Sequence, residues 1–194
     1  MRSVSTPTTI MQALLPTRGV LRDLPIDAVL VVGYALLTGL AAQIKFFVNP
    51  AVPITGQTFA VLLAGATLGS KRGFASMSVY LAAGIIGLPV FASGGAISGA
   101  SRGYLIGFVA AAVVVGYLAE RGWSSNPYKL ITAMFAGEVL IYAFGLPWLA
   151  FYVPRDKVLE YGLTPFIFGD TFKLLLAALL VPICLEGIRR LKNT

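Results

Sequence analysis

The chain has 194 residues, of which 57% are hydrophobic and only 12% are charged, and its formal net charge is +7. A soluble domain of this length carries about twice that charged fraction, so the composition predicts one helical membrane domain. The apolar segments are continuous and do not alternate, which argues against a β-barrel. Histidine is absent and cysteine occurs once, which excludes histidine metal sites, nucleophile–histidine pairs and an intrachain disulfide. We interpret the positive charge as an orientation signal and not as a nucleic-acid-binding surface.

Residues 1–24 form a leader of mixed polarity that lacks the apolar core and cleavage site of a signal peptide, so we expect a cytoplasmic tail that lies partly on the membrane surface. Residues 25–194 are predicted to form an all-α transmembrane domain, a bundle of six helices. Pro25 suits the first turn of the first helix. The second and third helices are short for a crossing, which takes about 20 residues. The six predicted helices span residues 26–47, 57–68, 74–88, 104–118, 130–151 and 166–191.

Basic residues divide unequally between the two sides of this predicted bundle. Ten fall in the leader, the second and fourth interhelical turns and the C-terminal segment, and five fall on the other side or its approaches. This excess predicts that both termini lie in the cytoplasm. The proline-bounded linker 50–57 and the glycine-rich linker 93–99 are then expected on the outer side.

Asp170 and Lys173 are charged residues three positions apart in the last apolar segment. Charges in a membrane cost about 3 kcal/mol or more and usually face the bundle interior at a substrate, ion or proton site. The spacing places both side chains on one helix face, about one turn below the outer surface. Such a pair suits a polar ligand with neighbouring NH and C=O groups, such as a cyclic urea or amide. The alternative is a structural ion pair that ties the sixth helix to its neighbours.

Five other positions are candidates for polar contacts. Gly94 and Gly95 either let backbone N–H groups converge under a closing loop or form a plain flexible connector. Arg102, beside that loop, either pairs with a ligand carboxylate or is an interfacial arginine that extends to water. Gln57 opens the second helix and can bond a ligand or a loop carbonyl. Glu138, in the fifth segment, either pairs with a basic residue of another helix or lies at a water-filled cleft.

Small residues on the first helix form the pattern Ala35-x-x-x-Gly39, which lets a second helix approach closely. The pattern serves either packing within the bundle or docking of a partner membrane protein. The chain has no G-x-x-x-x-G-K-[ST] phosphate loop, so it does not hydrolyse ATP by that route.

Six short motifs resemble, in their order along the chain, the BioY family of biotin-specific S components, the substrate-binding membrane subunits of energy-coupling factor (ECF) transporters. Their combination is more specific than any one of them, and the resemblance covers roughly residues 26–191. The motifs are VPITGQT (52–58), LGSKRG (68–73), GLPVFA (87–92), GYLIGF (103–108), GLPWLA (145–150) and GDTFK (169–173).

The resemblance implies a multi-pass protein of the bacterial cytoplasmic membrane that captures biotin beneath its outer loops for uptake. It implies no enzymatic activity and no cofactor. The implied partners are a transmembrane coupling protein and two cytoplasmic ATPase subunits, and only these subunits use ATP. By similarity, Asp170 and Lys173 contact the ligand, while Ala35 and Gly39 match a motif that docks against the coupling protein. The predicted substrate-binding set is Asp170, Lys173, Gly94, Gly95, Tyr104, Arg102 and Gln57.

The segment GASRGY (99–104) departs from the family pattern. The family often ends this loop with Gly-Pro-Thr-x-Gly-Tyr, and in some members an arginine follows the tyrosine and meets the biotin carboxylate. Leu105 follows Tyr104 here. Arg102 is the expected substitute because it is close in sequence.

Two alternative functions are weaker. An S component for another vitamin, of the thiamine or riboflavin class, relies on other polar and aromatic residues, and the Gly-Asp-x-x-Lys pattern favours biotin. An aspartyl membrane protease of the prepilin-peptidase type resembles FGDTFKL (168–174) loosely, but the spacing differs. Its mechanism also needs a second aspartate beside Asp170. Asp23 and Asp27 are expected near the cytoplasmic face, and Asp156 lies in a polar loop.

Overall fold

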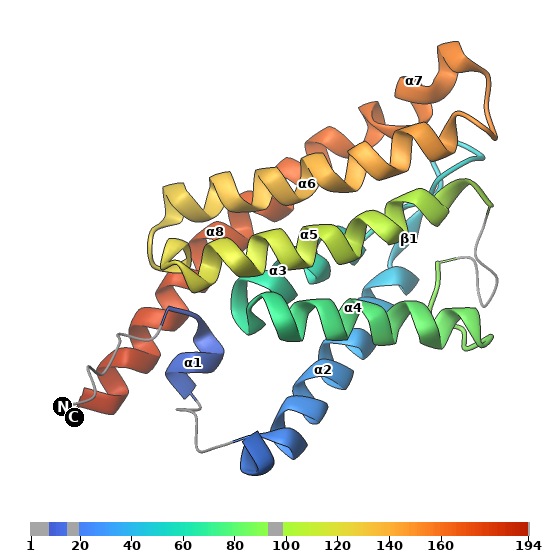
Figure 1. The fold of residues 1–194 in the computed structure, drawn as a ribbon. Coiled ribbons are helices and arrows are strands. Elements are labelled where there is room, and N and C mark those ends of the chain that lie inside the picture. The colour runs from blue at the N-terminus through green and yellow to red at the C-terminus, as the bar shows by residue number, and fades with distance from the viewer. Residues whose placement is uncertain (1–7, 15–19, 93–98, 194) are drawn as a thin grey trace.

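The computed structural model describes residues 8–14, 20–92 and 99–193, and over these ranges the chain is a helical bundle with one small ribbon of two strands (Figure 1). The two strands are β1 (Lys45–Phe46) and β2 (Ile54–Thr55). Two helices are short, α1 (Ile10–Leu14) and α7 (Val158–Gly162). The longer helices are α2 (Val20–Gln43), α3 (Gln57–Leu68), α4 (Ser70–Ile85), α5 (Arg102–Glu120), α6 (Pro127–Leu149) and α8 (Thr164–Asn193).

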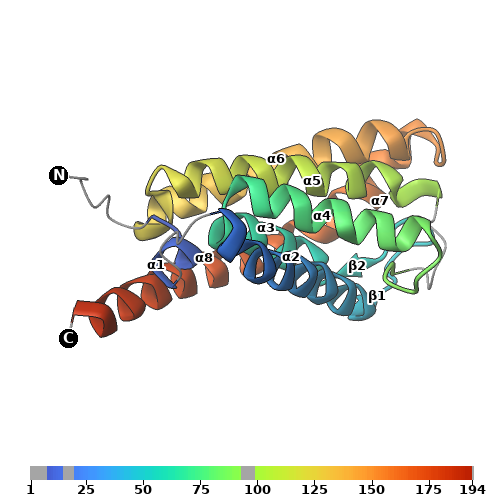
Figure 2. The ribbon, with the colours of Figure 1, turned by 60° about the horizontal axis from the view of Figure 1, so that its bottom comes forward.

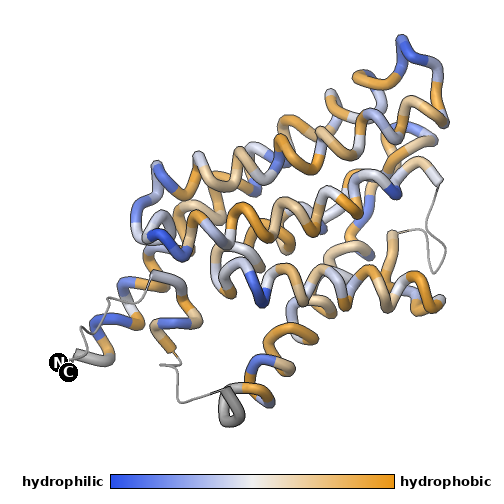
Figure 3. The backbone as a smooth tube through the Cα atoms, in the orientation of Figure 1, coloured by the Kyte–Doolittle hydropathy of each residue, from blue (hydrophilic) through white to orange (hydrophobic). Residues whose placement is uncertain are grey.

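Four segments in the described part of the chain are long and apolar enough to cross a membrane: 24–43, 99–120, 127–149 and 155–191. Hydrophobic residues cover the middle of the long helices, and hydrophilic residues gather toward their ends (Figure 3). α3 has 12 residues, and at about 1.5 Å per residue it extends about 18 Å, less than the ~30 Å of a bilayer core. The expectation of a short second segment is therefore confirmed.

α3 lies at the centre of the bundle. All of its residues except Phe59 and Leu63 are buried, and it packs against α2, α4, α5 and α8. Small residues such as Ala60, Ala64 and Gly65 let these neighbours approach closely. A helix that is buried on every side needs no polar face, which explains its nearly uniform apolar sequence.

A sharp corner joins α3 to α4. Gly69 adopts φ 86°, a left-handed conformation that favours glycine. Glu120 of α5 accepts hydrogen bonds from the Ser70 backbone N–H at 2.8 Å and from the Ser70 hydroxyl at 2.9 Å. These bonds satisfy donors at the first turn of α4. Gly116 makes the approach possible, since a Cβ there would lie 2.4 Å from the Ser70 nitrogen.

The first helix and its linker differ from the sequence prediction. α2 begins at Val20, so it runs through the predicted boundary at residue 24 and places Pro25 inside the helix. The predicted end at residue 47 is wrong, because the chain leaves the helix after Gln43 and pairs β1 with β2 in an antiparallel register. The predicted all-α fold class is therefore incomplete, because it does not include this two-stranded ribbon. Asn49 shapes the linker by accepting hydrogen bonds from the backbone N–H groups of Ala51 (2.9 Å) and Val52 (3.0 Å).

The described ends of the chain lie at the same end of the bundle. α1 and the last turns of α8 meet there beside the α5–α6 turn, whereas the ribbon and α7 lie at the opposite end (Figures 1 and 2). The Thr8 hydroxyl donates to the Glu120 carbonyl oxygen at 3.0 Å, and Arg189 donates to the Ser125 hydroxyl at 3.0 Å. The two described ends of the chain therefore lie at the end of the bundle opposite the ribbon.

Candidate functional site

A cavity that is partly open to solvent lies at the ribbon end of the bundle, between the β1–β2 linker and α3, α5, α6 and α8, and about 860 Å³ of empty space lies in it and at its mouth. Most of its wall is apolar or aromatic, with a few polar groups, which is typical of a small-molecule site. Its lining residues are Phe47, Pro50, Ala51, Val52, Pro53, Thr55, Gln57, Thr58, Phe91, Ala92, Ser101, Tyr104, Leu105, Phe108, Ile141, Tyr142, Phe166 and Asp170.

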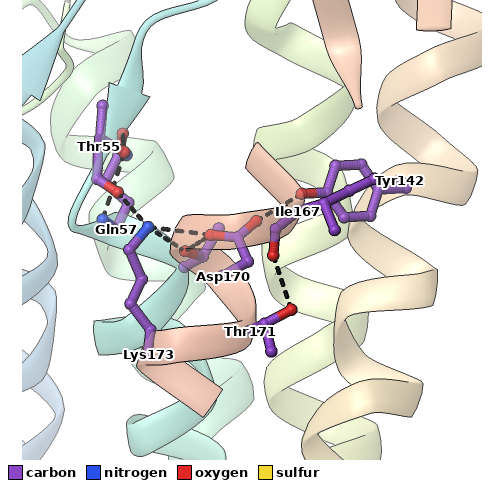
Figure 4. A network of polar contacts seen from close by, with 8 residues as sticks. Thr55, Gln57, Tyr142, Ile167, Asp170, Thr171 and Lys173 are labelled. Carbon is purple, nitrogen blue, oxygen red and sulfur yellow. Dashed lines mark hydrogen bonds and ion pairs between the residues drawn. The ribbon is translucent and has the colours of Figure 1, made fainter. Parts of the chain in front are cut away.

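Asp170 of α8 is the charged residue in the described wall of this cavity and is only 4% exposed. Its Oδ1 accepts hydrogen bonds from the Thr58 hydroxyl at 3.0 Å and from Lys173 Nζ at 2.9 Å. Its Oδ2 accepts a hydrogen bond from the Tyr142 hydroxyl. Tyr142 and Lys173 approach the carboxylate from opposite sides (Figure 4). Three elements, α3, α6 and α8, therefore hold this carboxylate in place.

Lys173 completes the cluster from behind the wall. Its Nζ donates to the Thr55 carbonyl oxygen at 2.7 Å and to the Thr58 hydroxyl at 3.1 Å, in addition to Asp170. An ammonium group has three N–H donors, so all three are directed at protein acceptors. Lys173 is not among the residues that line the cavity. The predicted ion pair is thus present and ties α8 to β2 and α3, while a ligand contact by Lys173 stays a prediction.

Gln57 and Tyr104, two of the predicted substrate-binding residues, line the cavity, and ligand contact by either one stays a prediction. Gln57 Nε2 donates to the Tyr80 hydroxyl at 2.6 Å, and its Oε1 accepts from the Thr55 hydroxyl at 2.9 Å. The Tyr104 hydroxyl donates to the Gly162 carbonyl oxygen at 2.9 Å, and the Tyr104 ring stacks on Phe166. The amide of Gln57 and the hydroxyl of Tyr104 both form hydrogen bonds within the protein. These two side chains are therefore held in fixed positions in the cavity wall.

The other predicted contact residues lie elsewhere. One side of the N-terminal end of α5 faces the cavity, which it lines with Ser101, Tyr104, Leu105 and Phe108. Arg102 is exposed and is not part of the lining. Its pairing with a carboxylate stays a prediction. The positions predicted at Gly94 and Gly95 lie outside the described residues.

Ala35 and Gly39 of α2 face inward. Ala35 is 6% exposed and belongs to the core, and a Cβ on Gly39 would lie 3.3 Å from the Cβ of Val90. Ala35 and Gly39 therefore pack against other parts of the same chain. A role for them in docking a partner stays a prediction.

Thr58 and Tyr142 were not singled out as site residues by the sequence. Thr58 follows Gln57 at the start of α3, and Tyr142 follows Glu138 by four residues on α6, so each lies beside a position already marked as polar. Glu138 is 5% exposed, and neither carboxylate oxygen has a hydrogen-bond partner among the described residues. The described chain places no group of three acidic or cysteine side chains that could hold a metal ion.

Known proteins provide an independent comparison. Residues 11–190 match the sequence model of the BioY family. A relative named "Probable biotin transporter BioY" from Lysinibacillus sphaericus is 42% identical over 127 residues, which span 64% of this chain and 64% of that protein. "Biotin transporter BioY" from Thermotoga maritima is 40% identical over 152 residues, with 76% of this chain and 88% of that protein covered.

A solved structure shows the same fold. The S component for biotin from an ECF-type ABC transporter superimposes with a TM-score of 0.69 at 24% sequence identity, and the match covers 91% of this chain and 95% of that chain. The family match covers nearly the whole chain, and the long apolar helices agree with it. The chain therefore belongs to the BioY family and is a multi-pass membrane protein.

Proposed function

We propose that this protein captures biotin for uptake across the cytoplasmic membrane as the S component of an ECF-type transporter. The observation that carries this proposal is a buried carboxylate, Asp170, on the wall of an otherwise apolar cavity. The names of the relatives and the fold shared with a biotin S component support it.

The cavity chemistry suits the parts of biotin. The two N–H groups of its ureido ring can donate to Asp170, whose oxygens are held in place by Thr58, Tyr142 and Lys173. The ureido oxygen can accept from Lys173 if the ammonium exchanges one of its protein acceptors. The fused rings and the aliphatic chain suit the aromatic wall, to which Phe91, Phe108, Tyr104 and Phe166 contribute.

We further propose that all six long helices lie in the membrane, with both termini in the cytoplasm and the cavity near the outer face. The excess of basic residues on one side supports this orientation. The meeting of α1 and the end of α8 at one end of the bundle agrees with it. α3 is too short for a crossing and reaches only part of the way through the bundle centre.

The partners in this proposal are a transmembrane coupling protein and cytoplasmic ATPase subunits. α2 offers the largest free face for such a partner, because only 17% of its apolar span is buried, the lowest share among the four described spans. Val29, Val32, Leu36 and Leu40 form exposed apolar surface on this helix. This surface meets either lipid or a partner helix.

Binding of labelled biotin to the purified protein tests the proposal. We expect Asp170→Asn to weaken binding on the order of a hundredfold, because the amide cannot accept from all three donors. Lys173→Ala is expected to act in the same direction, since it removes the counterion of Asp170. Thr171→Val is the matched control on α8: Thr171 is exposed, and its hydroxyl bonds only the Ile167 carbonyl oxygen (Figure 4).

Absence of biotin binding by the parent protein would overturn the function. If excess thiamine or riboflavin displaced labelled biotin, the site would be assigned to that vitamin instead. Unchanged affinity in both Asp170→Asn and Lys173→Ala would leave the function standing but move the ureido site away from this cluster.

A further inference from the structure

The described wall of the cavity holds no cation for the carboxylate of biotin. Asp170 is the charged group in the described lining, and it is already paired with Lys173. A carboxylate that leaves water without a cation or a hydrogen-bond donor pays a large desolvation penalty. We propose that Lys45 of β1 binds the ligand carboxylate at the rim of the cavity. This inference rests on the proposed function and names a further residue of the same site.

Three observations bring Lys45 to the cavity. Its cross-strand partner in the ribbon is Thr55, so the two side chains lie on one face of the ribbon, and Thr55 lines the cavity. Phe47, which directly follows β1, also lines it, so the chain on both sides of Lys45's strand pair reaches the wall. Lys45 Nζ donates to the carbonyl oxygen of Ala92, a third lining residue, at 2.5 Å.

The ammonium group of Lys45 has capacity for a ligand. It has three N–H donors, and one of them is directed at Ala92. None of the ion pairs in the described chain includes Lys45. The residue is half-buried, so a hydrogen bond from its ammonium to a carboxylate is less screened by water than one at the open surface.

Other basic residues at this end of the described chain are less well placed. Lys157 donates to Glu160 at 2.6 Å and is already paired with that carboxylate. Lys45, Arg102 and Arg155 all lie outside the lining itself, but Arg155 and Arg102 are exposed, whereas Lys45 is half-buried and bonds the lining residue Ala92. Lys45 is connected to the cavity wall in two ways: its strand partner Thr55 lines the cavity, and its ammonium group donates a hydrogen bond to the lining residue Ala92.

A comparison of biotin with its methyl ester tests the assignment, because the ester keeps the rings and the chain but carries no charge. The variants are Lys45→Met, which keeps the length and apolar stem, Lys45→Arg, which keeps the charge, and Arg102→Gln, which removes the other candidate. We expect Lys45→Met to weaken biotin binding by about ten- to a hundredfold and to leave ester binding within about twofold. Lys45→Arg is expected to keep most of the affinity for biotin. Arg102→Gln is expected to lose less affinity for biotin than Lys45→Met does.

Each other result has a distinct meaning. An equal loss of biotin and ester binding in Lys45→Met would show that Lys45 only supports the ribbon, and a larger selective loss in Arg102→Gln than in Lys45→Met would assign the carboxylate to Arg102. Either result would overturn the inference while the proposed function stands. Equal affinity of the parent for biotin and ester would do the same. If the parent binds neither ligand, the proposed function itself fails. Retained ester binding shows that Lys45→Met is folded.

Discussion

The two buried carboxylates of the bundle have opposite surroundings. Asp170 is 4% exposed, and both of its oxygens accept hydrogen bonds. Glu138 is 5% exposed, and neither oxygen has a partner among the described residues. A buried polar group without a hydrogen bond costs free energy, whereas a fully bonded ion pair compensates for much of its desolvation. At the level of single residues, Asp170 is therefore held in a fixed position, whereas the described structure leaves Glu138 buried without a hydrogen-bond partner.

We predict that Glu138→Leu raises the free energy of unfolding by about 1 kcal/mol or more, because an apolar side chain of similar size replaces an unpartnered carboxylate. Thermal unfolding in detergent measures the change. Glu186→Gln is the control, because Glu186 is an exposed carboxylate paired with Arg190, and such pairs contribute about 0–1 kcal/mol. A large loss of stability in Glu138→Leu would reveal a polar partner that Glu138 needs.

Tyr142 gives a second prediction at the residue scale. Tyr142→Phe removes the donor to Asp170 Oδ2 and keeps the ring in the cavity wall. We expect biotin affinity to fall about tenfold or more, since a hydrogen bond to a charged group contributes roughly 1.5–3 kcal/mol. Tyr128→Phe, at a tyrosine of the same helix that is 79% exposed, is expected to bind normally. Equal affinities of the two variants would show that Tyr142 does not hold the carboxylate.

Among the elements, the short helix α3 and its corner with α4 organise the site. α3 supplies Gln57 and Thr58 from its first turn, and the corner at Gly69 returns the chain toward the cavity end through α4. Contact of this corner with α5 depends on Gly116, because a Cβ there would meet backbone atoms of Gly69 and Ser70 at 2.4–2.7 Å. Backbone cannot move aside as a flexible side chain can, so this contact requires glycine.

Gly116→Ala is therefore expected to destabilise the protein by about 1–3 kcal/mol, the usual range for forced overpacking. Gly187→Ala on α8 is the matched control: a Cβ there would have nothing within 4 Å, and alanine favours a helix by up to about 1 kcal/mol over glycine. Chemical or thermal unfolding of both variants measures the contrast. Equal stabilities would show that α4 and α5 can separate without cost.

At the scale of the whole molecule, the direction of the bundle in the membrane determines which side the cavity faces. The α5–α6 turn and the described chain ends share one end, and the ribbon, the cavity and α7 share the other. Uptake from outside requires the cavity end to face outward.

Cysteine accessibility tests this orientation. In a Cys184→Ser background, Lys129→Cys marks the first turn of α6, and Asp156→Cys marks the turn before α7; both positions are exposed. We expect a membrane-impermeant maleimide to label the Asp156→Cys variant in intact cells and the Lys129→Cys variant only after lysis. Labelling in the reverse order would contradict the orientation inferred from the basic residues.

Properties that repeat along the chain could be predicted from the sequence. Apolar length indicated a helical membrane protein, and the three-residue spacing placed Asp170 and Lys173 on one face of the last helix, where the structure shows their ion pair. The ribbon formed by residues 45–46 and 54–55 could not be predicted. Each strand has only two paired residues, which are too few to show an alternating hydrophobic pattern.

Hydrophobicity, helical spacing and motifs are local along the chain, and they were enough to predict the class of the protein, its apolar segments, the family resemblance and the charged pair. Only the tertiary structure brought Thr58 and Tyr142 to Asp170, across 112 and 28 residues of chain. It also turned Ala35 and Gly39 inward, left Arg102 exposed and joined Lys45 to Ala92 of the cavity wall by a hydrogen bond. Which side of a helix faces a cavity depends on how all the helices pack together, and no local pattern contains that information.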